Sequence, residues 1–266
     1  IAYVKHMIAF KTSIYHLILM SVIAVILPLN LSAQEEKPLR VLFVGNSFTY
    51  FWNMPQLVQA MGASQGVSLE IRQSTVGGSN LKQHWLEEKG TLTRKFLKEE
   101  RWDYVILGDH SLSTINTPES FDLYAKKFTE LVRSIGAEPL FYMTWAYKSN
   151  PLMQPFITKG YQDIATELDA SVIPVGPIWM RAKELRPDLN LYFDNKHPSP
   201  DGSYLIALIV YQTLTGNSIN QISNRVTTID SDGEKLYLSF VLKENAVFFQ
   251  QLVTEAEIQP IKLEKE

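Results

Sequence analysis

The sequence predicts an α/β fold, a flavodoxin-like three-layer α/β/α sandwich around a mainly parallel five-stranded sheet. Short apolar segments of strand length alternate with longer helical patterns, which is typical of right-handed βαβ units. Polar residues and glycines directly follow the strand segments. Hydrophobic residues make up 45% of the 266 positions, enough for one domain to bury a large core.

Taken in chain order, the elements follow from apolar spacing and from helix and strand signals. We expect strands at residues 39–44, 67–71, 104–107, 139–143 and 172–175. We expect helices at residues 55–61, 91–99, 118–135, about 155–168 and 200–214, the last ending at Gly216. The tail from about residue 226 is ambiguous: residues 236–242 fit a strand, or the first turns of a helix that runs to residue 255.

The N-terminal residues 1–33 differ in character from the rest. Lys5 and Lys11 precede an apolar stretch at 17–29, and the small residue Ala33 follows it. A basic start, a short apolar middle and a small residue at the end are typical of a secretory signal peptide, here cleaved after Ala33. We therefore expect an exported protein, periplasmic or extracellular, with a bacterial-type signal peptide.

A retained signal anchor is the competing interpretation, although the apolar stretch is short for a membrane span. Met7 is a candidate for the true start of translation. After cleavage we expect a linker at 34–38, a single domain at 39–266 with an ambiguous C-terminal extension, and no stable membrane insertion.

Charge and cysteine content exclude several function classes. The formal net charge is −3, and lysines and arginines are scattered, so no basic stripe indicates a nucleic acid partner. The chain has no cysteine. This excludes disulfides, zinc-thiolate sites, a thiol nucleophile and lipid attachment through a cysteine.

Residues that could form a catalytic or binding site follow successive predicted strands. Ser47 follows the first strand, Gly77 and Gly78 the second, His110 the third and Trp145 the fourth. Because ligands bind beyond the carboxyl ends of the strands in open α/β sheets, we expect these residues to line one site.

Asp194 stands three residues before His197, about 150 residues after Ser47. A serine hydroxyl needs a base to become a nucleophile, and the base needs a group that orients it. Asp194 can fold back on Nδ1–H of His197 and leave Nε2 facing Ser47. Asp201 is the competing carboxylate, but we expect it to cap the following helix.

The Gly45-Asn46-Ser47 turn after the first strand and the Asp194-x-x-His197 pair resemble the SGNH (GDSL-like) hydrolase family. The resemblance runs from about residue 39 to residue 214 and implies a Ser47, His197 and Asp194 triad without a cofactor. The missing Gly-x-Ser-x-Gly pattern argues against the nucleophile elbow of α/β-hydrolases.

The resemblance also implies an oxyanion hole, with one departure. The family's donors match the backbone N–H groups of Ser47 and Gly78, with Gly77 as the alternative to Gly78. Where the family has an asparagine side chain, this chain has His110, whose neutral imidazole can donate one hydrogen bond. A structural His110 satisfied by nearby backbone is the alternative.

Two further residues complete the predicted site. We expect Trp145 to line the pocket and to stack on a sugar ring. We expect His84 to be a half-buried residue beside Trp85 on a helix face, with a place at the pocket's border as the alternative. No His-x-His or His-Glu-x-x-His spacing is present, so no metal is expected.

These observations together predict a secreted serine esterase. The resemblance implies small acyl esters on carbohydrates or lipids as substrates, and the exported location favours acetyl esters on carbohydrates. The expected partner is a small-molecule or polysaccharide ester. Two alternatives stay open: a lipid esterase or lysophospholipase that uses the same residues, and a catalytically silent carbohydrate-binding protein on the same fold.

Overall fold

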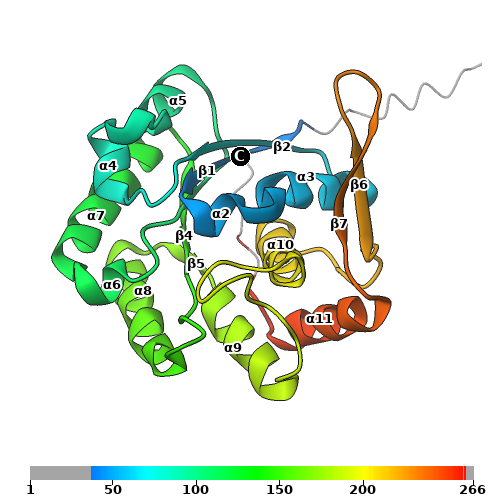
Figure 1. Ribbon diagram of the computed structural model, residues 1–266. Coiled ribbons are helices and arrows are strands. Elements are labelled where there is room, and N and C mark those ends of the chain that lie inside the picture. The colour runs from blue at the N-terminus through cyan, green and yellow to red at the C-terminus, as the bar shows by residue number, and fades with distance from the viewer. Residues whose placement is uncertain (1–36, 260, 262–266) are drawn as a thin grey trace, which may run out of the picture. The chain divides into compact units, whose positions relative to one another are not determined.

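A computed structural model describes residues 37–259 and residue 261 (Figure 1). Its central sheet has five strands, all of whose neighbouring pairs are parallel, in the order β2-β1-β3-β4-β5. The strands are β1 (Leu39–Gly45), β2 (Leu69–Thr75), β3 (Tyr104–Leu107), β4 (Glu138–Tyr142) and β5 (Ser171–Ile173). This order is the flavodoxin-like one, so the predicted fold class is confirmed.

Helices cover both faces of the sheet (Figure 1). One face carries α3 (Met54–Ser64), α9 (Val175–Leu185), α10 (Pro200–Thr215) and α11 (Lys243–Glu255). The other carries α4 (Leu81–Trp85), α5 (Thr93–Glu99), α7 (Pro118–Ser134) and α8 (Gln154–Leu168). Side chains of β1 alternate between the two cores, Val41 and Phe43 on one side and Leu42 and Val44 on the other.

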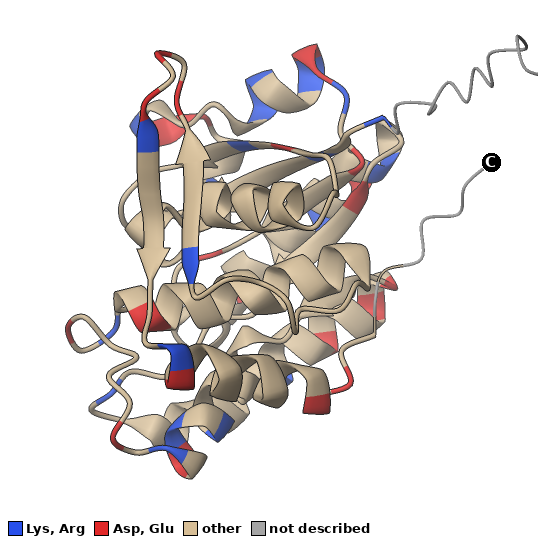
Figure 2. Cartoon of the chain, turned by 90° about the vertical axis from the view of Figure 1, so that its right-hand side faces the viewer, with Lys and Arg blue, Asp and Glu red and all other residues tan. Residues whose placement is uncertain are grey.

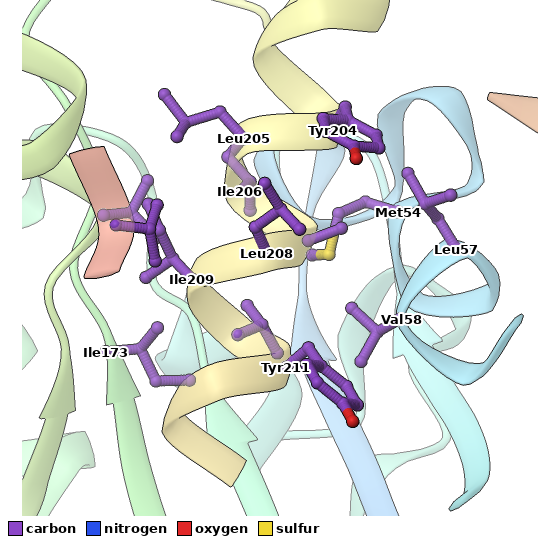
Figure 3. Packing of buried hydrophobic residues seen from close by; sticks show 14 of the residues in the cluster. Met54, Leu57, Val58, Ile173, Tyr204, Leu205, Ile206, Leu208, Ile209 and Tyr211 are labelled. Atoms are coloured by element: carbon purple, nitrogen blue, oxygen red, sulfur yellow. The ribbon is translucent and has the colours of Figure 1, made fainter. Parts of the chain in front are cut away.

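The core on the first face is organised around α10, which is buried on all sides for most of its length. Figure 3 shows Met54 and Val58 of α3 on the side of α10 that carries Tyr204 and Tyr211. Gly202, in the first turn of α10, lies against the backbone oxygen of Leu191 and the ring of Trp179, where a side chain would clash. This close packing holds α10 directly behind the loop that ends at Ser199.

Most predicted elements are present, with shifted ends. β2 begins two residues later than expected and continues to Thr75, well past the apolar run. It is an edge strand with partly exposed side chains, so hydrophobicity alone misplaces its end. The sequence analysis did not predict α9 and extended the last strand to residue 175, where this helix begins. Pro177 lies in the first turn of α9, where proline is well tolerated.

The ambiguous tail contains both of the proposed structures. β6 (Arg225–Ile229) and β7 (Lys235–Phe240) form an antiparallel hairpin, and α11 follows after two residues. The hairpin packs beside α3 and α10 and stands at the right of Figure 1. Figure 2 shows acidic and basic residues interspersed on this side of the molecule.

Short helices occupy the connections at the site and elsewhere: α2 (Ser47–Tyr50), η1 (Phe51–Asn53), η2 (Glu88–Gly90), α6 (Ser113–Asn116) and η3 (Pro151–Met153). Within the described part of the chain, no helix is long and apolar enough to cross a membrane. The predicted signal peptide and most of the predicted linker lie outside the described residues.

Candidate active site

The candidate active site lies at the carboxyl edge of the sheet, beyond β1 and β3. The strand order reverses between these two strands, and open α/β sheets bind ligands at this switch point. A cavity of about 320 Å³ opens here. Its wall comes from the loops after β1, β2 and β3 and from the loop before α10: Asn46, Ser47, Phe48, Tyr50, Phe51, Gly78, His110, Ser111, Lys196 and His197.

The structure brings Ser47, His197 and Asp194 into hydrogen-bonding contact. Ser47 Oγ lies 2.9 Å from His197 Nε2, and His197 Nδ1 lies 2.7 Å from Asp194 Oδ2. With its proton on Nδ1, the imidazole donates to Asp194 and leaves Nε2 free to accept the proton of the serine hydroxyl. A nucleophile, a base and an orienting carboxylate are therefore aligned in the order that acyl transfer requires.

Asp194 is held as a carboxylate by its neighbours. Burial opposes its ionisation, but the ring of His197 and the backbone N–H groups of His197 and Lys196 all donate to it. The backbone bonds both have a length of 2.7 Å. Together these donors lower the pKa of Asp194 from 3.8 to about 2. The negative charge that orients the imidazole is thus present throughout the neutral range.

Asp201, the competing carboxylate, does not orient His197. It lies in the first turn of α10 and accepts a hydrogen bond from Asn245 Nδ2 at 2.8 Å. The expectation that it caps α10 is also wrong, because Ser199 is the N-cap and its side chain accepts the N–H of Gly202.

The prediction that Trp145 lines the pocket is wrong. Its side chain is completely buried and is sandwiched between Phe48 at 4.7 Å and Trp179 at 4.6 Å, measured between ring centroids. Its indole Nε1–H donates to the backbone oxygen of Lys196 at 2.9 Å. Trp145 therefore supports the loop that carries His197 from below, and no face of its ring is free for a sugar.

The ring that does meet the site is Phe51, which the sequence analysis did not single out. Phe51 stacks on the imidazole of His197 with a centroid distance of 4.4 Å and an interplanar angle of 5°. Its position directly after the four residues of α2 was the available signal, because such a short helix keeps Phe51 close to Ser47. The stacking fixes the plane in which Nε2 points at the serine.

The three predicted oxyanion donors, Ser47, Gly78 and His110, all line the cavity. Ser47 is the first residue of α2, so its backbone N–H has no partner within the helix. Gly78 lines the cavity with a left-handed φ of 65°, while its neighbour Gly77 faces the hydroxyl of Tyr50. This favours Gly78 over Gly77 as the donor from the second loop.

His110 lines the same cavity. Burial, together with the charges of Lys196 and Lys89, lowers the pKa of its imidazole, which favours the neutral form that carries a single N–H. Its backbone N–H donates to Asp109 Oδ1 at 2.6 Å, whereas its ring nitrogens bind no partner among the described residues. The alternative of a ring satisfied by nearby backbone therefore gains no support from the structure.

Asn46 connects the three loops that form the cavity. Its side-chain nitrogen donates to the backbone oxygens of Ser79 at 2.9 Å and Asp109 at 3.0 Å. Its side-chain oxygen accepts the N–H of Phe48 and so caps α2. The sequence analysis used Asn46 only as part of a motif, but every hydrogen bond of its carboxamide positions a wall of the site.

His84 lies beneath the site and does not border the cavity. Expected to be half-buried, it is completely buried. Its Nδ1 lies 2.6 Å from Thr93 Oγ1, and its Nε2 lies 2.8 Å from Ser79 Oγ and 3.0 Å from the backbone oxygen of Gly45. Burial lowers the pKa of His84 to about 4, against a weaker opposing effect of the Gly45 carbonyl. A neutral imidazole thus joins the end of β1, the loop after β2 and the start of α5.

No three metal-ligating side chains gather anywhere in residues 37–259. A larger cavity of about 450 Å³ lies between α9 and α11, but its only ionisable wall residues are Arg181 and Glu255. It has no serine or histidine, so the smaller cavity is the one equipped for nucleophilic chemistry.

Comparisons with known proteins were made for sequence and structure. No family model matches the chain, and no curated protein matches it. Several solved structures do. A protein from Slackia heliotrinireducens described as an SGNH hydrolase is 25% identical, with a TM-score of 0.59, over 66% of this chain and 99% of that one. The chain has the fold of the SGNH hydrolases.

Two further structures with this fold are similar to the chain. A DUF4886 family protein from Bacteroides uniformis is 21% identical, with a TM-score of 0.64, over 83% of this chain and 95% of that one. An acetyl xylan esterase is 13% identical, with a TM-score of 0.54, over 65% of this chain and 98% of that one. The SGNH fold and the contacts of Ser47 are those of an ester-hydrolysing serine hydrolase.

The buried His84 should make stability depend on pH. Its folded pKa of about 4 lies below the ordinary 6.5, so the unfolded chain binds more protons between these values. Stability is then complete above about pH 6.5 and falls by about 3 kcal/mol as the pH drops to about 4. Buried Asp109, with a pKa raised to about 6, contributes the opposite slope.

Urea unfolding of the wild type and of His84→Gln at several pH values separates the two contributions. Between pH 6.5 and 4, the difference in unfolding free energy between the two proteins should shrink, because only the wild type loses the His84 contribution. A constant difference across this range would contradict the assignment.

His110 should act on turnover rather than on substrate affinity. If its ring donates to the developing oxyanion, His110→Ala removes a hydrogen bond that is strongest in the transition state. We expect kcat for an acetate ester to fall about 100-fold with little change in KM. His110→Asn, which restores an amide donor, should recover part of the loss. A thermally stable His110→Ala enzyme with unchanged turnover would remove His110 from the site.

Proposed function

We propose that this protein is an exported serine esterase that removes small acyl groups, in particular acetyl groups, from carbohydrate esters. The observation that carries the proposal is the alignment of Ser47 Oγ, the imidazole of His197 and the carboxylate of Asp194 in a cavity at the switch point of an SGNH fold.

In the proposed mechanism, His197 Nε2 takes the proton of Ser47 Oγ as the oxygen attacks the acyl carbon. Negative charge then collects on the former carbonyl oxygen. The backbone N–H groups of Ser47 and Gly78 and the ring of His110 stabilise this charge. Asp194 stabilises the imidazolium that forms beside it.

When the tetrahedral intermediate collapses, the bond between the acyl carbon and the alcohol oxygen breaks. His197 gives its proton to that oxygen, and the alcohol leaves with the acyl group bound to Ser47. A water molecule then attacks the acyl-enzyme while His197 accepts its proton. His197 returns this proton to Ser47 Oγ as the carboxylic acid departs, which restores the resting enzyme.

The character of the cavity supports a short acyl group. Its volume is about 320 Å³, and its lining combines the aromatic Phe48, Tyr50 and Phe51 with polar residues that include Asn46, His110 and Ser111. A long acyl chain would need a continuous apolar channel, whereas polar side chains interrupt this lining. The acetyl xylan esterase among the similar structures agrees with this inference.

Loss of the nucleophile or the base should abolish turnover. Because members of a triad act as a unit, Ser47→Ala and His197→Ala should each lower kcat for an acetate ester by roughly 1,000-fold or more, and combining them should not multiply the losses. A fluorophosphonate probe should label the wild type at Ser47 and leave Ser47→Ala unlabelled.

Ser134→Ala is the matched control, since Ser134 lies at the exposed end of α7 and outside the cavity. It should be labelled and turn over ester as the wild type does. Substantial esterase activity in a purified Ser47→Ala variant would reject Ser47 as the nucleophile.

Export is a separate part of the proposal and depends on residues 1–33 alone. If the basic start and the apolar stretch at 17–29 direct secretion, the exported form should begin at Gln34. N-terminal sequencing of protein recovered outside the cytoplasm checks this expectation. Recovery of the protein in a membrane fraction with residues 17–29 still attached would show a retained anchor instead.

A further inference from the structure

A row of aromatic rings leads from His197 to the surface. Phe51 stacks on His197, and Phe193 lies 6.2 Å from Phe51 between ring centroids. Trp52 meets Phe193 edge to face, with centroids 5.8 Å apart and an interplanar angle of 74°. The two outer residues are exposed, Trp52 to 41% and Phe193 to 62%. Because these two exposed rings contact each other beside a reactive centre, they form a contiguous apolar patch, which is the kind of surface that binds ligands.

The backbone at Trp52 has a strained conformation. Trp52 and Asn53 have left-handed φ values of 54° and 53°, which bulky residues rarely adopt. Such strain persists only where surrounding contacts impose it, and it concentrates at functional sites. Here the indole Nε1–H of Trp52 donates to the backbone oxygen of Pro198 at 2.8 Å. This bond ties the exposed ring to the residue directly after His197.

Phe193 is fixed to the same loop. Its backbone N–H donates to the backbone oxygen of His197 at 2.9 Å, and it directly precedes Asp194 in the chain. Its apolar ring is exposed to 62% and has Phe51 and Trp52 as its aromatic neighbours. The positions of both exposed rings are therefore set relative to the imidazole.

The direction of proton transfer identifies which part of a substrate reaches these rings. His197 returns its proton to the oxygen of the leaving alcohol, so the alcohol portion must lie beside the imidazole. The carbonyl oxygen of the substrate points instead toward the proposed oxyanion donors, which include Gly78 and His110 of the same cavity. A row of rings that starts at His197 and continues outward consequently follows the alcohol portion.

We propose that Trp52 and Phe193 form a subsite for a sugar ring in the alcohol portion of the substrate. This inference rests on the proposed function. A sugar ring has apolar C–H faces and polar edges, so it can lie on an exposed aromatic ring while its hydroxyl groups stay in water. The rings of Trp52 and Phe193, at an interplanar angle of 74°, can contact a sugar ring on two of its sides. An alkyl chain on the same open surface would remain largely in contact with water.

The test compares two acetate esters in the wild type, Trp52→Ala, Phe193→Ala and Phe156→Ala. One substrate is an acetylated xylo-oligosaccharide, and the other is methyl acetate, whose alcohol is too small to reach the rings. The ratio of kcat/KM for the sugar ester to kcat/KM for methyl acetate should fall about three- to tenfold in either site variant, mainly through KM for the sugar ester. Phe156 is the matched control, because it is a 67% exposed residue of α8 that belongs neither to the cavity wall nor to the row of rings. It should keep the wild-type ratio.

Trp52→Ala also removes the hydrogen bond to Pro198, so the fluorophosphonate labelling rate of Ser47 is measured in each variant. Phe193→Ala removes no side-chain hydrogen bond and keeps the test valid if Trp52→Ala misfolds. A wild-type ratio in a normally labelled Phe193→Ala variant would overturn the subsite. Loss of activity toward methyl decanoate, with the sugar ester unaffected, would assign the rings to an acyl chain and also overturn it.

Failure of the proposed function can be told apart from failure of the subsite. A wild type that neither reacts with the probe nor hydrolyses methyl acetate would reject the esterase itself. Calorimetric titration with acetyl-free xylotriose then still measures the subsite, because binding needs no turnover. Weaker binding to Phe193→Ala than to wild type would support the subsite, and equal or undetectable binding by both would overturn it.

Discussion

The architecture of the site depends on the buried carboxamide of Asn46. A parallel sheet brings the ends of β1, β2 and β3 to one edge, but it does not set the distances between the loops that follow them. Asn46 does so by donating to one backbone oxygen in each of the two neighbouring loops and by capping α2 with its own oxygen. These partners are buried, so losing any one would leave a polar group unsatisfied away from water. The nucleophile, Gly78 and His110 all take their places from this one side chain.

Much of the fold was accessible from the sequence because its signals are local. The alternation of apolar strands with helical patterns indicates parallel βαβ units, and the residues after each strand indicate where a site should form. Ser47, Asp194 and His197 could be brought together from their two motifs and from the family that these motifs resemble. Helix α9 and the edges of β2 were less accessible, since proline, glycine and solvent-exposed strand residues weaken the same signals.

What the sequence could not show is the direction in which a side chain points. Trp145 follows β4 at the carboxyl edge, as a pocket residue should, yet it turns inward because Phe48 and Trp179 offer two faces to pack against. Phe51 and Trp52 turn toward the loop before α10, because Phe51 stacks on His197 and the indole of Trp52 donates to Pro198. His84 is drawn inside by three polar partners on separate segments. Each outcome depends on tertiary contacts that no local pattern contains.

The spacing of the three aligned residues divides their assembly into two very different steps. Asp194 and His197 are only three residues apart, so the chain closes a very short loop to pair them. Ser47 and His197 are separated by 150 residues, and their contact requires nearly the whole sheet to be in place. The entropic cost of closing a loop grows with its length. His197 and Asp194 therefore form one local unit, whereas Ser47 joins them only in the finished fold. Ser47 is consequently expected to be reactive only in molecules whose whole domain has folded.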